Sequence, residues 1–335
     1  MKIAIIGAGA IGGYVGAKLA LAGEDVTFLV RGENLRAIRE HGVCLQYADG
    51  SEQVARNVRA TDDYGEAGPQ DLVILATKAH QVAAVAEQLP RLFHADTAVV
   101  TMQNGIPFWY FHKTGGVLEG SPVRSVDSDG ELARRIPPER VIGCVVYPAS
   151  ELVAPGVVRH VEGDRFPLGE LDGSESERVQ RIAAAFTRAG FKAPVLTDIR
   201  AEIWLKLWGN LSFNPISGLT HATLLDICQD PLGRGLAADM MREAQAVAGK
   251  LGITFRVPLD KRIAGAEKVG RHKTSMLQDI EAGRAPEIDA LVGSVAELAR
   301  LTDTPTPHID AVYALVKLLA KNMEASGGRV RLQAA

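Results

Sequence analysis

A glycine-rich hexapeptide near the amino terminus has the spacing of a dinucleotide-binding turn: the apolar stretch Lys2–Ile6 precedes it and a helical pattern at 11–22 follows. In such a turn the first glycine permits a tight bend, the second lets the backbone approach a pyrophosphate, and the third lets helix and strand pack closely. The pyrophosphate then lies at the positive end of the helix. The alternative is a glycine turn with a purely structural role. The hexapeptide consists of Gly7, Ala8, Gly9, Ala10, Ile11 and Gly12.

The residue after the second apolar stretch indicates which dinucleotide binds. NAD-binding domains usually place Asp or Glu there to hold the ribose 2′-hydroxyl, whereas an arginine suits a 2′-phosphate. Here the stretch 25–30 runs into Arg31, and an arginine can donate two hydrogen bonds to one phosphate. We therefore predict NADP as the cofactor. The alternatives are a surface arginine without a ligand, and Glu33 as a ribose ligand for NAD.

Two further polar residues follow apolar stretches that resemble buried strands. Lys78 comes after 71–77, and Asn104 comes after 97–102. Ligands bind at the carboxyl ends of the strands in an open α/β sheet, so both residues are candidate ligand contacts. On position alone, either could equally be an ordinary loop residue.

A polar stripe in the second half of the chain contains a candidate general acid. Helical spacing places Glu202, Lys206 and Asn210 on one face, and Asn214 precedes Pro215, where we expect the helix to end. Hydride transfer to a ketone creates an alkoxide, which a partly desolvated lysine could stabilise and protonate. The alternative is a solvated face with a weakly stabilising Glu–Lys pair. Spacing alone favours this second interpretation.

These candidates need a framework, and the chain provides two different patterns for it. Up to about residue 195, short apolar stretches alternate with helical patterns, which indicates a parallel sheet covered on both faces. We predict an α/β fold whose Rossmann-type, doubly wound sheet spans 1–197 and whose all-helical domain spans 198–335. Strands that close the first domain are expected at 141–147, 157–160 and 165–168. Helices are expected at 201–212, 231–251, 288–301 and 308–325, and a frayed tail from Gly327.

Composition and charge exclude several classes of protein. The 335 residues are 47% hydrophobic and 23% charged, as in a globular protein of two domains. A formal net charge of −3 provides no basic field for nucleic acid or an anionic membrane. The three cysteines lie far apart and without metal-ligand spacing, which fits a reducing compartment.

Membrane and export signals are also missing from the sequence. No stretch reaches the roughly 18 apolar residues of a membrane span. The amino-terminal apolar run is interrupted by glycines, which disfavours a signal peptide. We expect a soluble cytoplasmic protein that binds a small molecule and no nucleic acid, membrane or metal.

Six motifs that occur in order make the chain resemble the ketopantoate reductase (2-dehydropantoate 2-reductase) family. The resemblance runs from residue 1 to about residue 320. Any one of these motifs is weak evidence, but their order is specific. They are Gly7–Gly12, Thr77–Ala79, Gln103–Gly105, Glu202–Asn210 with Asn214 and Pro215, Thr274–Asp279, and Gly283–Asp289.

The resemblance implies a catalytic residue and a set of substrate ligands. Lys206 is implied as the general acid that protonates the alkoxide. Asn210, Asn214 and Ser275 are implied to hold the substrate, with Ser275 at its carboxylate, and Asn104 to touch both substrate and nicotinamide. Without the resemblance, Ser275 is equally a helix N-cap.

Further cofactor contacts follow from the same resemblance. It implies that Lys78 and Asn104 contact the cofactor, that Glu287 reaches its ribose region, and that Ala149 makes a backbone contact with it. Without the resemblance, Glu287 is an ordinary acid in the first turn of a helix.

Two departures from the family bear on substrate choice. An asparagine expected about ten residues after Asn214 is missing, because His221–Leu224 stands there, and the stretch 106–140 is longer and more aromatic than expected. We expect NADPH-dependent reduction of a 2-oxo acid, with ketopantoate to pantoate in pantothenate biosynthesis as the leading reaction. The alternatives are a paralogue that reduces another bulky 2-oxo acid and a non-catalytic NADP(H)-binding sensor. A homodimer is expected as well.

Overall fold

The computed structural model describes residues 1–330, and the chain packs into two units. The sheet unit comprises 1–103, 111–122 and 129–199, and the helical unit comprises 104–110, 123–128 and the chain from Arg200 onward. Two short segments of the first half of the chain, 104–110 and 123–128, thus pack with the second half. Of the tail expected to fray, residues 331–335 lie outside the described residues.

The sheet unit contains a seven-stranded sheet in the order β11-β8-β7-β6-β1-β2-β5. All neighbours are parallel except β11, which is antiparallel to β8. The chain winds in one direction from β1 to β5 and in the other from β6 onward, so the predicted Rossmann-type fold is confirmed, with its switch point between β1 and β6. The strands are β1 (Lys2–Ile6), β2 (Asp25–Leu29), β5 (Val58–Thr61), β6 (Gln70–Leu75), β7 (Phe93–Thr101), β8 (Val141–Cys144) and β11 (Leu168–Glu170).

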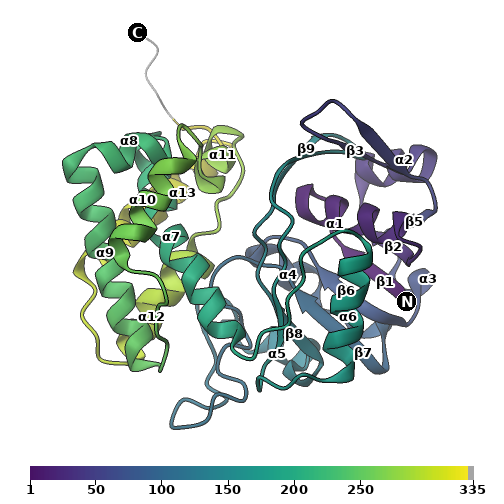
Figure 1. Cartoon of the computed structure of the whole chain (residues 1–335), viewed down its shortest axis with the longest axis horizontal. Coiled ribbons are helices and arrows are strands. Elements are labelled where there is room, and N and C mark those ends of the chain that lie inside the picture. The colour runs from purple at the N-terminus through teal and green to yellow at the C-terminus, as the bar shows by residue number, and fades with distance from the viewer. Residues whose placement is uncertain (331–335) are drawn as a thin grey trace. The chain divides into compact units, whose positions relative to one another are not determined.

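The central strands are buried on both faces, which explains their continuous apolar sequences. Ile3–Ile6 and Leu72–Leu75 are at most 1% exposed. Figure 1 shows the helices of this unit beside its strands. The helices are α1 (Ala10–Leu21), α2 (Gly32–His41), α3 (Tyr64–Ala67), α4 (Ala79–Ala86), α5 (Glu131–Arg135) and α6 (Glu177–Arg188), with the 3₁₀ turns η1 (Leu89–Leu92) and η2 (Pro138–Arg140).

The strand predicted at 157–160 is confirmed and lies in a second sheet of this unit. This segment belongs to β10 (Val157–Glu162), in a four-stranded sheet ordered β4-β3-β10-β9. The physical reason is the surface of α1, where Val158 lies against Gly13 and His160 stacks on Tyr14. The predicted strand 165–168 contributes only its last residue, to β11. The other strands of the second sheet are β3 (Val43–Gln46), β4 (Glu52–Ala55) and β9 (Ala149–Ala154).

The helical unit confirms the predicted change from alternating to helical structure. Its helices run from α7, teal in Figure 1, to α13 in yellow-green. The predicted helix 288–301 divides into a π-helix, η3 (Asp289–Gly293), and a following α-helix. The α-helices are α7 (Ile199–Thr220), α8 (Leu224–Gln229), α9 (Pro231–Lys250), α10 (Leu259–Val269), α11 (Ser275–Glu281), α12 (Ser294–Leu301) and α13 (Pro307–Ala325).

The prediction that α7 ends at Asn214 is wrong. The helix continues through Pro215 to Thr220, although proline removes one backbone donor and destabilises a helix interior by about 3 kcal/mol. Residues 211–218 are all buried, and Gly218 packs closely against Ile280 and Met276 of α11. Burial of this whole turn therefore outweighs the local preference of the residue before proline.

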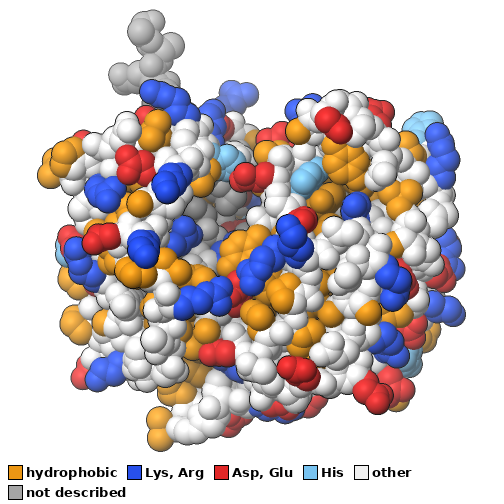
Figure 2. Space-filling model, viewed as in Figure 1, with side chains coloured by type: hydrophobic (Ala, Val, Ile, Leu, Met, Phe, Trp, Pro, Cys, Tyr) orange, Lys and Arg blue, Asp and Glu red, His pale blue; other side chains and the backbone are white. Residues whose placement is uncertain are grey.

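The length and apolarity of the helices and the charges of one face bear on the membrane and charge expectations. In residues 1–330 we find no helix with the length and apolarity that a membrane crossing requires. On the face shown in Figure 2, basic and acidic side chains are interspersed over both units.

Candidate functional site

The glycine turn lies between β1 and α1, at the switch point of the sheet. Gly7 has a φ of +92°, and a Cβ there would lie 2.7 Å from Cγ2 of Thr77, which follows β6. A Cβ on Gly12 would lie 1.9 Å from the carbonyl oxygen of Gly7. A Cβ on Gly9, by contrast, would meet no atom within 4 Å. The first and third glycines therefore shape the turn, and the second leaves its backbone accessible, as a bound pyrophosphate requires.

Two further features fit this turn to a phosphate group. The N-cap of α1, Gly9, provides no side-chain hydrogen bond to the first turn of the helix, so its N–H groups remain for a ligand. Asn34, which the sequence did not single out, holds the turn: its Nδ2 donates to the Ala8 carbonyl at 2.6 Å, and its Oδ1 accepts from Gly156 N at 2.6 Å. The turn is therefore supported from behind by a long-range contact.

A cavity of about 480 Å³ opens at the carboxyl ends of four parallel strands, where Gly7 and Arg31 both line it. Two groups in it are notable. The Thr77 hydroxyl is buried and has no hydrogen-bond partner among residues 1–330, so it is available to a ligand. Burial raises the pKa of Tyr64, and the nearby charge of Arg31 opposes that shift. The sequence identified Arg31 but missed the strand-end residues Asp62 and Tyr64, because β5 is too short to be recognised as a strand.

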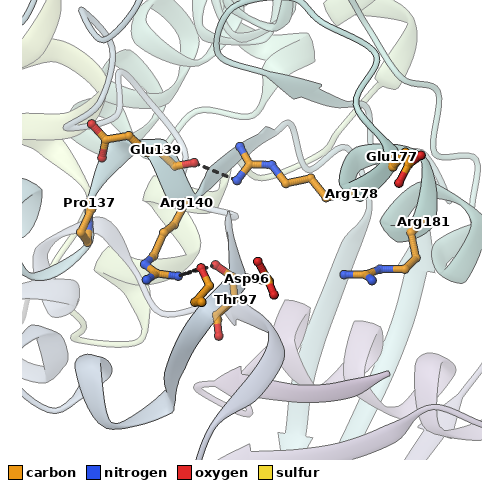
Figure 3. Close-up of a pocket in the computed structure, with 9 residues that line it drawn as sticks. Asp96, Thr97, Pro137, Glu139, Arg140, Glu177, Arg178 and Arg181 are labelled. Atoms are coloured by element: carbon orange, nitrogen blue, oxygen red, sulfur yellow. Dashed lines mark hydrogen bonds between the residues drawn. The ribbon is translucent and has the colours of Figure 1, made fainter.

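A larger cavity, of about 790 Å³, contains no predicted site residue (Figure 3). It lies around the start of β7, the chain before β8 and the first turns of α6. Arg178 donates to both carboxylate oxygens of Glu170 and to the Glu139 carbonyl, and Arg140 donates to the carbonyls of His94, Ala95 and Thr97. Two of its three arginines are thus engaged within the fold, at the sheet edge opposite to that where ligands bind.

The candidate acid and a candidate ligand from distant parts of the chain meet in the helical unit. Lys206 Nζ donates to Asn104 Oδ1 at 2.5 Å, across 102 positions of sequence. The preceding residue, Gln103, donates from Nε2 to the carbonyls of Leu75 and Thr77 at 2.9 Å each. Asn104, predicted at the end of a strand, and Lys206, predicted on a helix, therefore form one pair of interacting side chains.

The polar stripe of α7 is not a solvated face. The Glu202 side chain has no exposed surface and pairs with Arg256 at 2.7 Å, Lys206 is half-buried, and Asn214 is buried. Lys206 and Asn214 are two turns apart, about 12 Å along the helix. The stripe therefore presents polar groups in an interior that is otherwise lined by Trp and Leu.

At the other end of the stripe, Asn214 Nδ2 donates to Ser275 Oγ at 3.4 Å. The hydroxyl of Thr274 caps α11 by accepting from Leu277 N, and Ser275 is the first helical residue. The interpretation of Ser275 as the cap is therefore wrong, and its hydroxyl lies beside Asn214 instead. Asn210 lies on α7 between Lys206 and Asn214, half-buried.

The remaining predicted cofactor residues lie on three separate elements. Lys78 is the N-cap of α4, directly after Thr77. Ala149 is the first residue of β9, and Glu287 is half-buried two residues before the start of η3. Their roles stay predictions.

The aromatic part of the stretch 106–140 is buried. Trp109 and Tyr110 are each 2% exposed. Trp204 Nε1 donates to the Tyr110 hydroxyl at 2.7 Å, and Arg200 Nε donates to the Tyr110 carbonyl at 2.8 Å. Tyr110 therefore contacts the first two turns of α7, and one of its partners, Trp204, lies two residues before Lys206. The buried aromatic side chains do not form an exposed substrate loop.

Comparison with known proteins finds the same two-part organisation. The family described as "Ketopantoate reductase PanE/ApbA" matches residues 3–173, and the one described as "Ketopantoate reductase PanE/ApbA C terminal" matches residues 198–320. The 2-dehydropantoate 2-reductase of Mesorhizobium japonicum is 56% identical over 96% of this chain and 98% of its own length. That of Pyrococcus horikoshii is 30% identical over 95% and 97%. A solved structure of a putative ketopantoate reductase from Ralstonia solanacearum has a TM-score of 0.92 and 41% identity, covering 98% of this chain and 99% of that one.

Proposed function

Because the chain is an oxidoreductase that belongs to the ketopantoate reductase family, we propose that it reduces 2-dehydropantoate (ketopantoate) to pantoate with NADPH. This reaction is a step of pantothenate biosynthesis. The observation that carries the proposal is the bond from Lys206 Nζ to Asn104 Oδ1, on the polar stripe of α7. An ammonium group and an amide side chain meet there in a half-buried environment, and this supports the proposal that Lys206 protonates the reduced carbonyl oxygen.

A reductase of this family would use a nicotinamide cofactor, which would supply the hydride that adds to the C2 carbonyl carbon of the substrate. The turn Gly7–Gly12 would hold its pyrophosphate, because the Gly9 backbone is accessible and the first turn of α1 has no side-chain cap. Arg31, in the adjacent cavity, would hold a 2′-phosphate. This arginine is the reason for preferring NADPH to NADH.

Lys206 would act on the carbonyl oxygen. As negative charge develops on that oxygen, the ammonium group stabilises it, and Lys206 then transfers a proton to give the hydroxyl group. The bond to Asn104 fixes the direction in which the ammonium group points, so little reorganisation is needed during the reaction.

Asn210, Asn214 and Ser275 would bind the rest of the substrate. Amide and hydroxyl groups can donate to a carboxylate and accept from a hydroxyl, which are the polar groups of a hydroxylated 2-oxo acid. The Asn214–Ser275 contact of 3.4 Å supports the proposal that these two side chains bind one small ligand together.

A second candidate is a reductase of another bulky 2-oxo acid. The observation in its favour is His221–Leu224, which stands where the family has a further asparagine. His221, with a φ of +58°, directly follows the end of α7. The chemistry would be unchanged, and a different substrate side chain would be accommodated.

The test is NADPH oxidation at 340 nm with ketopantoate and a panel of other 2-oxo acids, with NADH as the cofactor control. We expect ketopantoate with NADPH to be the best pair. A faster reaction with another acid would transfer the assignment to the second candidate. Tight NADPH binding without turnover of any acid would contradict both candidates and favour a sensor. The expected homodimer stays a prediction, which light scattering on the full chain tests.

A variant of the acid completes the test. Lys206→Ala should lower kcat by about 10²–10⁴-fold, the usual contribution of general acid catalysis. Lys250→Ala, at an exposed lysine at the end of α9, is the matched control and should keep kcat. Full kcat in Lys206→Ala would refute the proposed mechanism.

A further inference from the structure

A π-helical turn lies in the helical unit, where the sequence predicted an uninterrupted α-helix. In η3 (Asp289–Gly293), the N–H of Ser294 bonds to the carbonyl of Asp289, five residues back. An α-helix would direct that N–H to Ala290. π-turns are rare and occur frequently at functional sites.

The carbonyl of Ala290 instead contacts the loop that carries Asn104. It accepts a hydrogen bond from Ile106 N at 3.0 Å and another from the buried hydroxyl of Ser294 at 2.7 Å. Gly105 has a φ of +93°, and a Cβ there would lie 1.9 Å from the Ala290 oxygen. The backbone on both sides of Gly105 is therefore set by the position of this one carbonyl.

The π-turn is held from its other side by α13. The Tyr313 hydroxyl donates to Asp289 Oδ1 at 2.6 Å, and Lys317 Nζ lies 3.0 Å from Asp289 Oδ2. The ring of Tyr313 lies directly against Gly293, where a Cβ would be 2.8 Å from its hydroxyl oxygen. Burial raises the pKa of Tyr313 and its bond to Asp289 adds to the shift, so the phenol stays protonated as a donor.

The geometry points to Tyr313 and Lys317 as positioning residues, which hold the π-turn at Asp289 and thereby fix Asn104 against Lys206. The chain of contacts is continuous: Tyr313 to Asp289, the π-turn to the Ala290 carbonyl, that carbonyl to Ile106 N, and Asn104 two residues earlier. The contacts of Tyr313 and Lys317 described here are with the π-turn, at Asp289 and Gly293. The inference rests on the proposed function, because its effect on catalysis is read at the reduction step.

Tyr313→Phe is the variant that tests it, since it removes one hydroxyl and keeps the ring against Gly293. A small misplacement of a reacting group can lower a rate by about 100-fold. For one lost bond in a clamp of two we expect kcat to fall about tenfold, with KM for NADPH within about twofold of wild type. Tyr47→Phe is the matched control, because it removes a hydroxyl that donates to Gln53 at 2.8 Å on the second sheet.

A double-mutant cycle separates positioning from general destabilisation. If Tyr313 acts through Asn104, then Tyr313→Phe should change kcat by less than about twofold in an Asn104→Ala background. An equal loss in both backgrounds would overturn the proposal. So would full kcat in Tyr313→Phe. Lys317→Met, which removes the other contact to Asp289, provides a second variant if Tyr313→Phe folds poorly.

Amide hydrogen exchange measures the bond from Ile106 N to the Ala290 carbonyl and does not depend on enzymatic activity. Peptides that contain Ile106 should exchange faster in Tyr313→Phe than in wild type, because the bond from Ile106 N to Ala290 opens more often. Unchanged exchange would overturn the inference. If the wild-type protein reduces no 2-oxo acid, the proposed function fails while this measurement still decides the positioning role.

Discussion

The dinucleotide turn and the Asn104–Lys206 pair are built in opposite ways. The turn is continuous in sequence, with a strand, six residues and a helix, and its two shape-determining glycines contact Thr77 and the turn itself. The pair joins residues 102 positions apart, and the loop that carries Asn104 is held by a carbonyl from η3. A turn of the first kind is fixed by local sterics, whereas a pair of the second kind depends on several packed elements at once.

This difference predicts which substitutions affect chemistry and which affect the fold. In the helical unit, polar changes near Lys206 should lower turnover with little loss of stability. In the sheet unit, changes at the glycine turn should act on stability or on cofactor binding, depending on the direction of the new side chain.

After Lys206→Ala, the largest effect is expected for Asn104→Ala. The variant removes the bond from Lys206 Nζ to Asn104 Oδ1, so the ammonium group is less well oriented and kcat should fall by about 100-fold. Steady-state kinetics with the best 2-oxo acid measures this, and thermal unfolding should show a nearly unchanged Tm. Asn57→Ala is a matched control, since its amide donates to the Ala20 carbonyl in the sheet unit and should leave kcat unchanged. A Tm loss that accounts for the whole activity loss would contradict the assignment.

Alanine substitutions at Gly9 and Gly12 of the turn should have different effects. Gly12→Ala forces a Cβ against the Gly7 carbonyl and should lower the free energy of unfolding by about 3 kcal/mol. Gly9→Ala meets no atom within 4 Å and should keep the fold but lose NADPH affinity. Urea unfolding and NADPH titration measure the two effects.

The control for the glycine experiment is Gly235→Ala on α9, where a Cβ also meets nothing within 4 Å. Alanine in place of a half-buried helical glycine with space for a Cβ should raise the free energy of unfolding by about 1 kcal/mol. Equal losses of stability in Gly9→Ala and Gly12→Ala would refute the distinction between Gly9, which leaves the backbone accessible to a pyrophosphate, and Gly12, which shapes the turn.

A smaller effect is expected at Arg31. Removing a charged hydrogen bond to a 2′-phosphate is worth about 1.5–3 kcal/mol, so Arg31→Ala should raise KM for NADPH about tenfold or more. KM for NADH should stay unchanged, since NADH has no such phosphate. Arg36→Ala, at an exposed arginine of α2 near Glu33, serves as the control. Equal changes for both cofactors would remove the reason for preferring NADPH.

The smallest effect is expected at Pro215 in α7. Pro215→Ala restores a backbone donor in a helix interior and should raise the free energy of unfolding by about 1 kcal/mol. Pro231→Ala is the control, because Pro231 is at the first position of α9, where proline is favoured. A loss of stability in Pro215→Ala would show that the proline shapes the turn that carries Asn214.

Some elements could be predicted from the sequence and others could not. The central strands, the glycine turn and most long helices follow from apolar runs and periodicity, because burial on both faces or on one stripe leaves a direct trace in the residue order. The place of β10 in a second sheet, the passage of α7 through Pro215 and the π-turn η3 do not. Each is stabilised by a partner far away in sequence: α1 for β10, α11 for α7, and α13 with the Asn104 loop for η3.

The sequence by itself determined the Rossmann-type sheet, the position of the dinucleotide turn, the residue types of the polar stripe and, through the order of its motifs, the family. The tertiary structure decided that Asn104 bonds to Lys206, that Asn214 meets Ser275, and that the aromatic side chains after residue 106 are buried against α7. The physical reason is the range of the interactions. Backbone sterics and hydrophobic periodicity act between neighbours in the chain, whereas the geometry of a pair of polar side chains depends on every element packed behind them.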